Sequence, residues 1–250
     1  MFLHGLGLSR SVFDPVVPAL EPVARVVRLD LRGHGATLAR DPAEPFRHHE
    51  DVIETLDALA LDRVDVVGLS LGGGVALDLA LARPDRVRRL VLLAPALSGW
   101  AWSDAWVAAF RTVRAVGRES GPRTALEAWH AHALFESTRA NPRAAAALEA
   151  MVFADDGRRW VEPDVARPLD PPAADRLAEV RASTLVLVGD QDLPDFRAIA
   201  ETLATHLPAV RLLVVAGAGH LLPLEAPDVT ARAIAAGLAA DVPPELRKGA

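Results

Sequence analysis

The residues of this chain that most clearly suggest chemistry surround Ser70. They form the run Gly-Leu-Ser-Leu-Gly at 68–72, which follows an apolar stretch of strand length and precedes a helical pattern. In such a strand-to-helix turn the serine hydroxyl stands at the tip of a sheet, and the glycines let helix and strand pack closely. The helix amino terminus favours negative charge beside it. This context favours a nucleophilic serine over a chance match in a loop.

A serine hydroxyl is a weak nucleophile unless a base takes its proton, and we expect that base to be a histidine. His220 comes just after the last strand-like run, where a loop at the carboxyl edge of a sheet begins. The pattern therefore predicts His220 as the base. His48 and His49 open an expected helix instead, and they are predicted to be solvent-exposed.

An acidic residue must orient the imidazole and stabilise its charged form. Asp192 and Asp190 both follow the strand-like run at 184–189. Asp192 is preferred, because a longer reach over the sheet edge is needed to meet a histidine from the next strand's loop. Asp190 remains the competitor, with turn capping as its expected role. Ser70, Asp192 and His220 would then form a catalytic triad in that chain order.

A tetrahedral intermediate on Ser70 would need two hydrogen-bond donors for its oxyanion. One expected donor is the N–H of Leu71, the residue after the nucleophile. The other is expected from the loop His-Gly-Leu-Gly at 4–7, as the N–H of Leu6. His4 itself is expected to make hydrogen bonds within its loop rather than to act in catalysis.

Strand-like and helical stretches alternate along most of the chain. The strand-like runs are short and almost entirely apolar, as in parallel sheets that are covered on both faces. Helical stretches carry apolar residues at a period of 3.6, for example Val52, Leu56 and Leu59. This alternation predicts an α/β fold with a mostly parallel sheet and helices on both faces. The expected strands are 26–31, 64–69, 89–94, 184–189 and 211–216, and the expected helices are 50–60, 75–82, 195–207 and 229–239.

Residues 97–172 interrupt the alternation, because they contain helix-prone segments and no strand-like run. We expect a core made of residues 1–96 and 173–250, with 97–172 as a helical cap or lid over the carboxyl ends of the strands. All 5 tryptophans lie in this lid, which favours an apolar substrate pocket over an ordinary helical core for at least some of them. The pocket candidates are Trp100, Trp102, Trp106, Trp129 and Trp160.

The composition narrows the classes of function. The chain has 250 residues, of which 51% are hydrophobic and 24% charged, as in a soluble domain with an insertion. The formal net charge is -6 with both signs mixed, so neither nucleic acid nor a membrane is expected as a partner. The chain lacks cysteine, which excludes thiol catalysis, and no metal or organic cofactor is expected. No signal peptide or apolar span is recognisable, so a cytoplasmic enzyme is expected; its oligomeric state is left open.

Several motifs together give the chain a family resemblance. They are HGLG at 4–7, DLRGHG at 30–35, GLSLGG at 68–73, and the pair GDQD and GAGHLLPLEAP at 189–192 and 217–227. With these motifs the chain resembles the α/β-hydrolase superfamily, in particular its small serine esterases, lactonases and cofactor-free haloperoxidase-like enzymes. The resemblance covers nearly the whole chain and implies the α/β-hydrolase fold, with structural roles for Arg32 and His34. Two strands and most of a third normally precede the first motif in this family, so these N-terminal strands are expected to be missing here.

The resemblance implies hydrolysis of a small ester or lactone through an acyl-enzyme on Ser70. Serine at this turn argues against dehalogenases and epoxide hydrolases, which carry aspartate there. Two alternatives stay open. The same triad could make peracids from acetate and peroxide, as in cofactor-free haloperoxidases and perhydrolases, because water and peroxide compete for one acyl-enzyme. A non-catalytic ligand-binding protein of the same fold is less favoured, since it would not need a complete triad.

Overall fold

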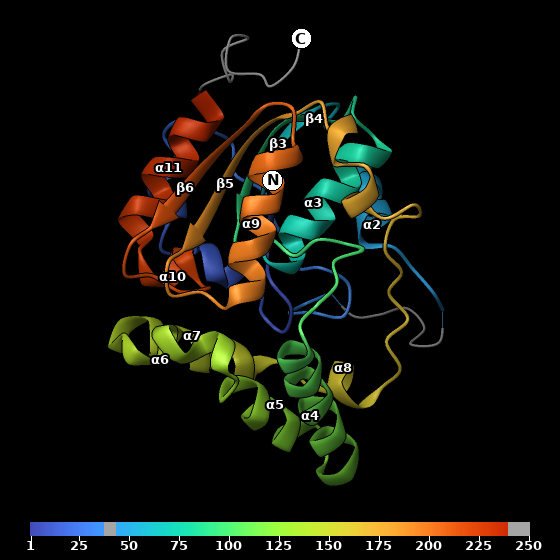
Figure 1. The fold of residues 1–250 in the computed structure, drawn as a ribbon, viewed down its shortest axis with the longest axis vertical. Coiled ribbons are helices and arrows are strands. Elements are labelled where there is room, and N and C mark those ends of the chain that lie inside the picture. Colours follow the sequence, from blue (N-terminus) through green and yellow to red (C-terminus); the bar gives the residue numbers. More distant parts are fainter. Residues whose placement is uncertain (38–43, 240–250) are drawn as a thin grey trace.

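In the part of the chain that the structure describes, residues 1–37 and 44–239, six strands form one parallel sheet (Figure 1). The structure is a computed structural model. The strand order is β2-β1-β3-β4-β5-β6, and each neighbouring pair is parallel. The strands are β1 (Phe2–Leu3), β2 (Arg28–Leu29), β3 (Val64–Leu69), β4 (Val87–Leu93), β5 (Ser183–Gly189) and β6 (Val210–Val215).

The register of the sheet brings the carboxyl ends of its strands to one edge. Leu69 of β3 lies opposite Leu93 of β4, which in turn lies opposite Leu187 of β5. Gly189, at the end of β5, lies opposite Val215 of β6. The loops after β3, β5 and β6 therefore leave the sheet at the same edge, which is where open α/β sheets bind their ligands.

Helices cover both faces of the sheet, as predicted. One face carries α2 (His48–Ala58), α3 (Leu71–Ala82) and α9 (Pro194–His206), and the other carries α1 (Val17–Leu20) and α11 (Pro227–Ala239). Successive residues of β4 alternate between the two cores, since Leu92 packs with the first group and Val91 with the second. A strand buried on both faces is apolar throughout, and this explains why the sequence shows continuous apolar runs.

Between β4 and β5 the chain forms a further group of helices within residues 104–161, which we call the helical insertion (Figure 1). It lies beyond the carboxyl ends of the strands, at the bottom of the view. Asp195 of α9 holds the start of the helical insertion in place. Its carboxylate accepts hydrogen bonds from the N–H and the hydroxyl of Ser103 at 2.9 and 2.6 Å. The helices of the insertion are α4 (Asp104–Ser120), α5 (Pro122–His130), α6 (Glu136–Ala140), α7 (Pro142–Ala154) and α8 (Arg158–Val161).

Short helical turns connect the remaining elements. They are α10 (Leu222–Glu225) and the 3-10 turns η1 (Arg10–Phe13), η2 (Ala133–Phe135), η3 (Ala173–Asp175) and η4 (Leu177–Glu179). No helix of the described residues is long and apolar enough to cross a membrane.

Most element boundaries lie within two residues of the predicted ones, and the two larger differences, in β2 and α3, have identifiable reasons. β2 covers only Arg28–Leu29 instead of 26–31, since its partner β1 is itself two residues long. Helix α3 begins at Leu71 rather than at residue 75. The glycines at 72–74 have low helix propensity, but close packing against the neighbouring loops makes them helical here.

The prediction that His48 and His49 are solvent-exposed is wrong. His49 is 4% exposed, and burial lowers the pKa of His48 to about 3. The start of α2 packs against the loop that follows β2, where the rings of His48 and His34 lie 6.2 Å apart. Periodicity within α2 could not reveal this burial, because the contact joins two separate segments.

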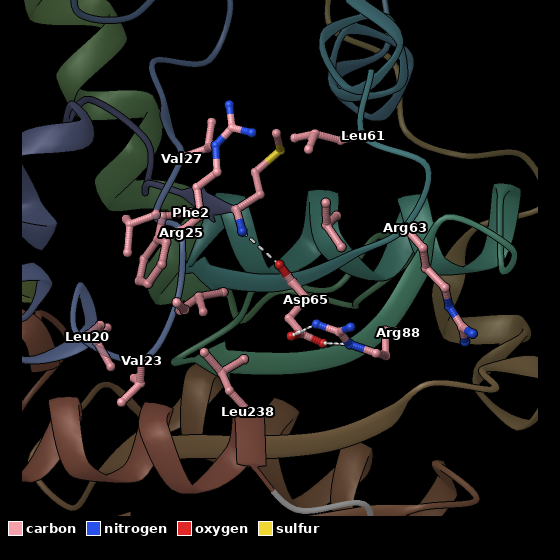
Figure 2. Close-up of a pocket in the computed structure, with 15 residues that line it drawn as sticks. Phe2, Leu20, Val23, Arg25, Val27, Leu61, Arg63, Asp65, Arg88 and Leu238 are labelled. Atoms are coloured by element: carbon pink, nitrogen blue, oxygen red, sulfur yellow. Dashed lines mark hydrogen bonds and ion pairs between the residues drawn. The ribbon is translucent and has the colours of Figure 1, made fainter. Parts of the chain in front are cut away.

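A cavity of about 350 Å³ lies by the amino-terminal ends of the strands (Figure 2). The amino group of Met1 there donates a hydrogen bond to the Asp65 carbonyl oxygen at 2.7 Å, and Arg88 pairs with the Asp65 carboxylate. Burial lowers the pKa of the Met1 amino group to about 6. The described lining contains no hydroxyl, thiol or imidazole, and it lies at the sheet edge opposite to Ser70.

Candidate active site

Ser70 occupies a sharp turn between β3 and α3. Its backbone has a φ of 51° and a ψ of -115°, which is sparsely populated for a residue other than glycine. Its N–H donates to the Leu93 carbonyl oxygen at 2.9 Å and ties the turn to β4. A Cβ on Gly68 would lie 2.3 Å from the Gly72 carbonyl oxygen, and a Cβ on Gly72 would lie 2.1 Å from that of Leu3. Only glycine at both positions allows the close approach that holds Ser70 at this edge.

His220 and Asp192 form a buried pair in the loops after β6 and β5. The Nδ1 atom of His220 lies 2.9 and 3.1 Å from the two carboxylate oxygens of Asp192, and the side chains are 1% and 0% exposed. Because a carboxylate only accepts, Nδ1 carries the proton in this contact. Nε2 is then the nitrogen that can accept a proton, and it has no hydrogen-bond partner among the described residues.

Asp190 lies apart from the imidazole. Its carboxylate is exposed and accepts a hydrogen bond from the N–H of Gly217 at 2.8 Å, which caps the turn after β6. The loop that carries Asp192 is held against the histidine loop by a 3.0 Å hydrogen bond from the Gln191 N–H to the Ala218 carbonyl oxygen. Of the two aspartates, the structure brings Asp192 to the histidine.

Glu225 of α10 holds the loop on both sides of His220. Its carboxylate accepts hydrogen bonds from the N–H of Gly219 at 2.7 Å and from that of Leu221 at 3.0 Å. The hydroxyl of Thr138, on α6 of the insertion, donates to the same carboxylate at 2.6 Å. Glu225 lies within the motif at 217–227 but was not predicted as a site residue, because nothing local in the sequence shows that its side chain turns back to the loop.

Two backbone N–H groups beside Ser70 are free to receive an oxyanion. Leu71 is the first residue of α3, so its N–H has no acceptor within the helix. Among residues 1–37 and 44–239, neither this N–H nor that of Leu6 donates a hydrogen bond. Both residues line the cavity that contains Ser70. The N–H of Gly72 donates to the His4 carbonyl oxygen at 3.0 Å and keeps the two segments together.

The imidazole of His4 fastens the loop that carries Leu6. Its Nδ1 lies 2.8 Å from the Gly5 carbonyl oxygen, and its Nε2 accepts the N–H of Leu31 at 3.0 Å. One nitrogen therefore donates and the other accepts, which describes a neutral ring. Burial lowers the pKa of His4 to about 4, in agreement with this neutral state.

A cavity of about 390 Å³ is lined by both Ser70 and His220, and we call it the catalytic cavity because it is the candidate site of catalysis. Its walls are mainly apolar, as in sites that bind small organic molecules. Three of the five tryptophans of the chain line it, and the rings of Trp102 and Trp106 stack at 4.9 Å. The other apolar lining residues include Leu8, Val107, Phe110, Trp129, Leu134 and Phe196.

The remaining two tryptophans lie elsewhere. Trp100 is outside the lining of the catalytic cavity and packs with the apolar core on the α3 face of the sheet. Trp160 is 1% exposed and lines a second cavity of about 400 Å³. We call this second space the arginine cavity, since its walls contain Arg32, Arg114, Arg158 and Arg159.

The loop Asp-Leu-Arg-Gly-His-Gly at 30–35 forms part of the wall of the arginine cavity. Arg32 forms an ion pair with Asp51 of α2. His34 is 3% exposed, and its Nε2 lies 2.6 Å from the guanidinium of Arg159. Arg159 was not predicted as a site residue, because nothing local in the sequence indicates that an arginine in a helical segment is buried.

No group of three or more His, Cys, Asp or Glu side chains within the described part of the chain is arranged to hold a metal ion. Beside the catalytic cavity the structure instead brings together the Ser70 hydroxyl, the His220 imidazole with the Asp192 carboxylate, and the free N–H groups of Leu6 and Leu71. This set can activate a hydroxyl nucleophile and stabilise an oxyanion.

The fold and this arrangement define the class of protein. The profile of the Alpha/beta hydrolase family matches residues 1–233, and the chain belongs to that family.

Similar proteins act on several kinds of bond. A protein of Caulobacter sp. (strain K31), provisionally named carbamate hydrolase RutD, is 31% identical over 90% of this chain and 84% of its own. The 3-oxoadipate enol-lactonase 1 of Acinetobacter baylyi is 26% identical over 91% of this chain and 84% of its own. Among solved structures, a thermophilic esterase from Thermogutta terrifontis matches with a TM-score of 0.74 and 26% identity, over 95% of this chain and 88% of that one.

Proposed function

We propose that the chain is a serine hydrolase that cleaves carboxylic esters or lactones, with Ser70, His220 and Asp192 as its catalytic triad. The observation that carries the proposal is the shared cavity. Ser70, in its strained turn, and the buried His220, paired with Asp192, line one apolar space. Residues 97–172 act in this proposal as a lid that supplies much of the apolar wall.

In the acylation step, the Ser70 hydroxyl oxygen attacks the carbonyl carbon while its proton passes to Nε2 of His220. Asp192 stabilises the resulting imidazolium through Nδ1. The carbonyl oxygen becomes an oxyanion that accepts hydrogen bonds from the N–H groups of Leu6 and Leu71. The C–O bond to the leaving group then breaks, and His220 returns the proton to the departing alkoxide oxygen.

In the deacylation step, water attacks the acyl-enzyme. His220 takes a proton from the water, and the same two N–H groups hold the second oxyanion. The bond between the acyl carbon and Ser70 oxygen breaks as His220 protonates that oxygen, which releases the carboxylic acid. For a lactone, the leaving alkoxide stays attached to the acyl group, and the product is one hydroxy acid.

The family relatives support bond cleavage at a carbonyl and leave the choice of bond to experiment. Their names mention a carbamate, an enol-lactone and an ester. The mostly apolar cavity favours an ester or lactone with an apolar portion.

The test is labelling with a fluorophosphonate probe, which reacts covalently with activated serines. Wild-type protein should be labelled and should hydrolyse 4-nitrophenyl butyrate, whereas Ser70→Ala should show neither reaction. Circular dichroism of both proteins checks that they are folded. A folded wild type without labelling would overturn the hydrolase proposal and favour a ligand-binding role for the same cavity.

A further inference from the structure

The arginine cavity adjoins the catalytic cavity at the proposed oxyanion site. The two spaces share Leu6, Leu71 and Phe110 in their linings. The N–H groups of Leu6 and Leu71 are the proposed oxyanion donors. A substrate with its carbonyl oxygen at those donors therefore lies at the boundary between the two cavities, within reach of both.

The two cavities differ in chemistry. The catalytic cavity is walled mainly by aromatic and aliphatic side chains. The arginine cavity contains four guanidinium groups and the imidazoles of His34 and His48. Its carboxylates are Asp155, Asp156, Glu162 and Asp164, so its formal charges balance. The net charge of the cavity therefore does not indicate what kind of ligand it binds, and the contacts of its individual charged groups must be considered.

Those carboxylates are engaged in local contacts. The oxygens of Asp155, Asp156 and Asp164 accept the N–H groups two residues further along the chain, at 2.8, 3.0 and 3.1 Å. Glu162 pairs with Arg158 at 2.7 Å. These contacts hold the turns around α8, and Asp155 in addition forms an ion pair with Arg159.

Arg159 is the inner cation of this cavity. Its side chain is 14% exposed and forms an ion pair with Asp155, whose carboxylate oxygen lies 3.6 Å from the guanidinium. His34 and the Gly33 carbonyl oxygen engage its two terminal nitrogens. Its Nε is buried and has no hydrogen-bond partner among the described residues. The contacts therefore orient the guanidinium and leave its Nε–H unpaired within the described part of the chain.

The next residue in the chain, Trp160, also carries an unpaired donor, since its Nε1 atom is buried and lacks a partner in the described part of the chain. Arginine Nε and tryptophan Nε1 can only donate hydrogen bonds, and leaving such a donor unpaired in the interior is destabilising. The terminal nitrogens of Arg159 carry more N–H groups than its contacts with His34 and Gly33 use, so they can donate to a ligand that brings negatively charged oxygens.

We propose that the arginine cavity binds a carboxylate group carried by the substrate, with Arg159 as its main partner. The inference rests on the proposed hydrolase function and narrows its substrate class to esters or lactones that bear a carboxylate. The carbonyl under attack lies at Leu6 and Leu71, and the carboxylate extends into the arginine cavity. Arg159 is a binding residue in this assignment and takes no part in proton transfer.

Matched substrates test the proposal. The 4-nitrophenyl half-esters of glutaric and adipic acid are compared with the neutral 4-nitrophenyl pentanoate. Wild-type protein should show a higher kcat/KM for the half-esters. Arg159→Gln should lower kcat/KM for the half-esters by about 10- to 100-fold, the usual worth of a hydrogen-bonded charge, and should change the neutral ester little. Arg159→Lys should recover part of the loss.

The matched control is Arg143→Gln, which removes an exposed arginine of α7 outside both cavities. It should leave both kinds of ester unaffected. Equal rates for half-esters and neutral ester in wild type, or an equal loss for both in Arg159→Gln, would overturn the carboxylate site and leave the hydrolase proposal intact.

A binding measurement tests the carboxylate site even if the protein cleaves none of these esters. Monomethyl adipate and methyl hexanoate are titrated into Ser70→Ala, which should keep the ester intact, and into the double variant with Arg159→Gln. Calorimetric binding of monomethyl adipate that is lost in the double variant supports the site. The carboxylate site is overturned if monomethyl adipate does not bind to Ser70→Ala, or if inorganic phosphate binds as tightly as monomethyl adipate.

Discussion

Asp190 and Asp192 carry identical side chains in the same loop, yet only Asp192 meets His220. Asp190 points its carboxylate to a backbone N–H at the surface. The difference arises because the loop after β5 crosses the sheet edge before it reaches the histidine loop. A shift of two residues along this loop therefore decides whether an aspartate contacts His220 or caps a turn at the surface.

Exchange of Asp192 for asparagine tests this difference. Asp192→Asn should lower kcat on a neutral ester by about 10³- to 10⁴-fold, because an amide no longer favours the tautomer with Nε2 free. Steady-state kinetics on 4-nitrophenyl butyrate measures the loss. Asp190→Asn is the matched control and should keep nearly the wild-type kcat. A larger loss for Asp190→Asn would reverse the assignment.

Helix α10 is only four residues long, yet it links three elements through Glu225. Its carboxylate holds the backbone on either side of His220 and also accepts the hydroxyl of Thr138 in α6. The histidine loop is thereby tied to the helical insertion. Small displacements of a catalytic group are costly, so we assign Glu225 a positioning role.

Glu225→Gln should lower kcat by about 10- to 100-fold, because the amide nitrogen cannot accept the N–H that the lost oxygen held. The rate of fluorophosphonate labelling should fall in parallel, while the protein stays folded by circular dichroism. Thr138→Val is the control, as it removes only the link to α6 and should affect kcat much less. Wild-type kcat and labelling in Glu225→Gln would refute the positioning role.

Across the whole molecule, buried histidines couple folding to pH. Burial lowers the pKa of His4 to about 4 and that of His48 to about 3, from 6.5. Asp30 partly opposes the shift of His4 and Arg159 adds to it. Below pH 6.5 the imidazoles of His4 and His48 become protonated in the unfolded chain but stay neutral in the folded protein until the pH nears their lower folded pKa values. Stability is therefore full above pH 6.5 and is lost as the pH falls towards the folded pKa values.

Urea unfolding at pH 7.5 and pH 5.0 measures this effect. The free energy of unfolding of wild type should be lower at pH 5.0, and His4 alone should account for about 2 kcal/mol of the loss. In His4→Gln the loss between the two pH values should be smaller by that amount, whatever its stability at pH 7.5. His206→Gln, at an exposed histidine that ends α9, should keep the wild-type pH dependence. The same pH dependence in His4→Gln and wild type would contradict the assignment.

The sequence by itself determined the parallel sheet, the helices on its faces and the turn at Ser70. Apolar runs of strand length, helical periodicity and glycines around a serine are local features, and they depend mainly on neighbouring residues. The order of Ser70, Asp192 and His220 along the chain followed from placing each after its own strand. The loops that carry these residues leave the sheet at one edge because its strands are parallel.

Only the tertiary structure decided which side chains are buried and what they contact. Arg159 and His34 are 125 residues apart in the chain, and Glu225 reaches Thr138 across 87. The burial of His48 and His49 has the same origin, in packing between separate segments. Burial and pairing are properties of surfaces brought together by folding, so no pattern of neighbours in the sequence encodes them locally.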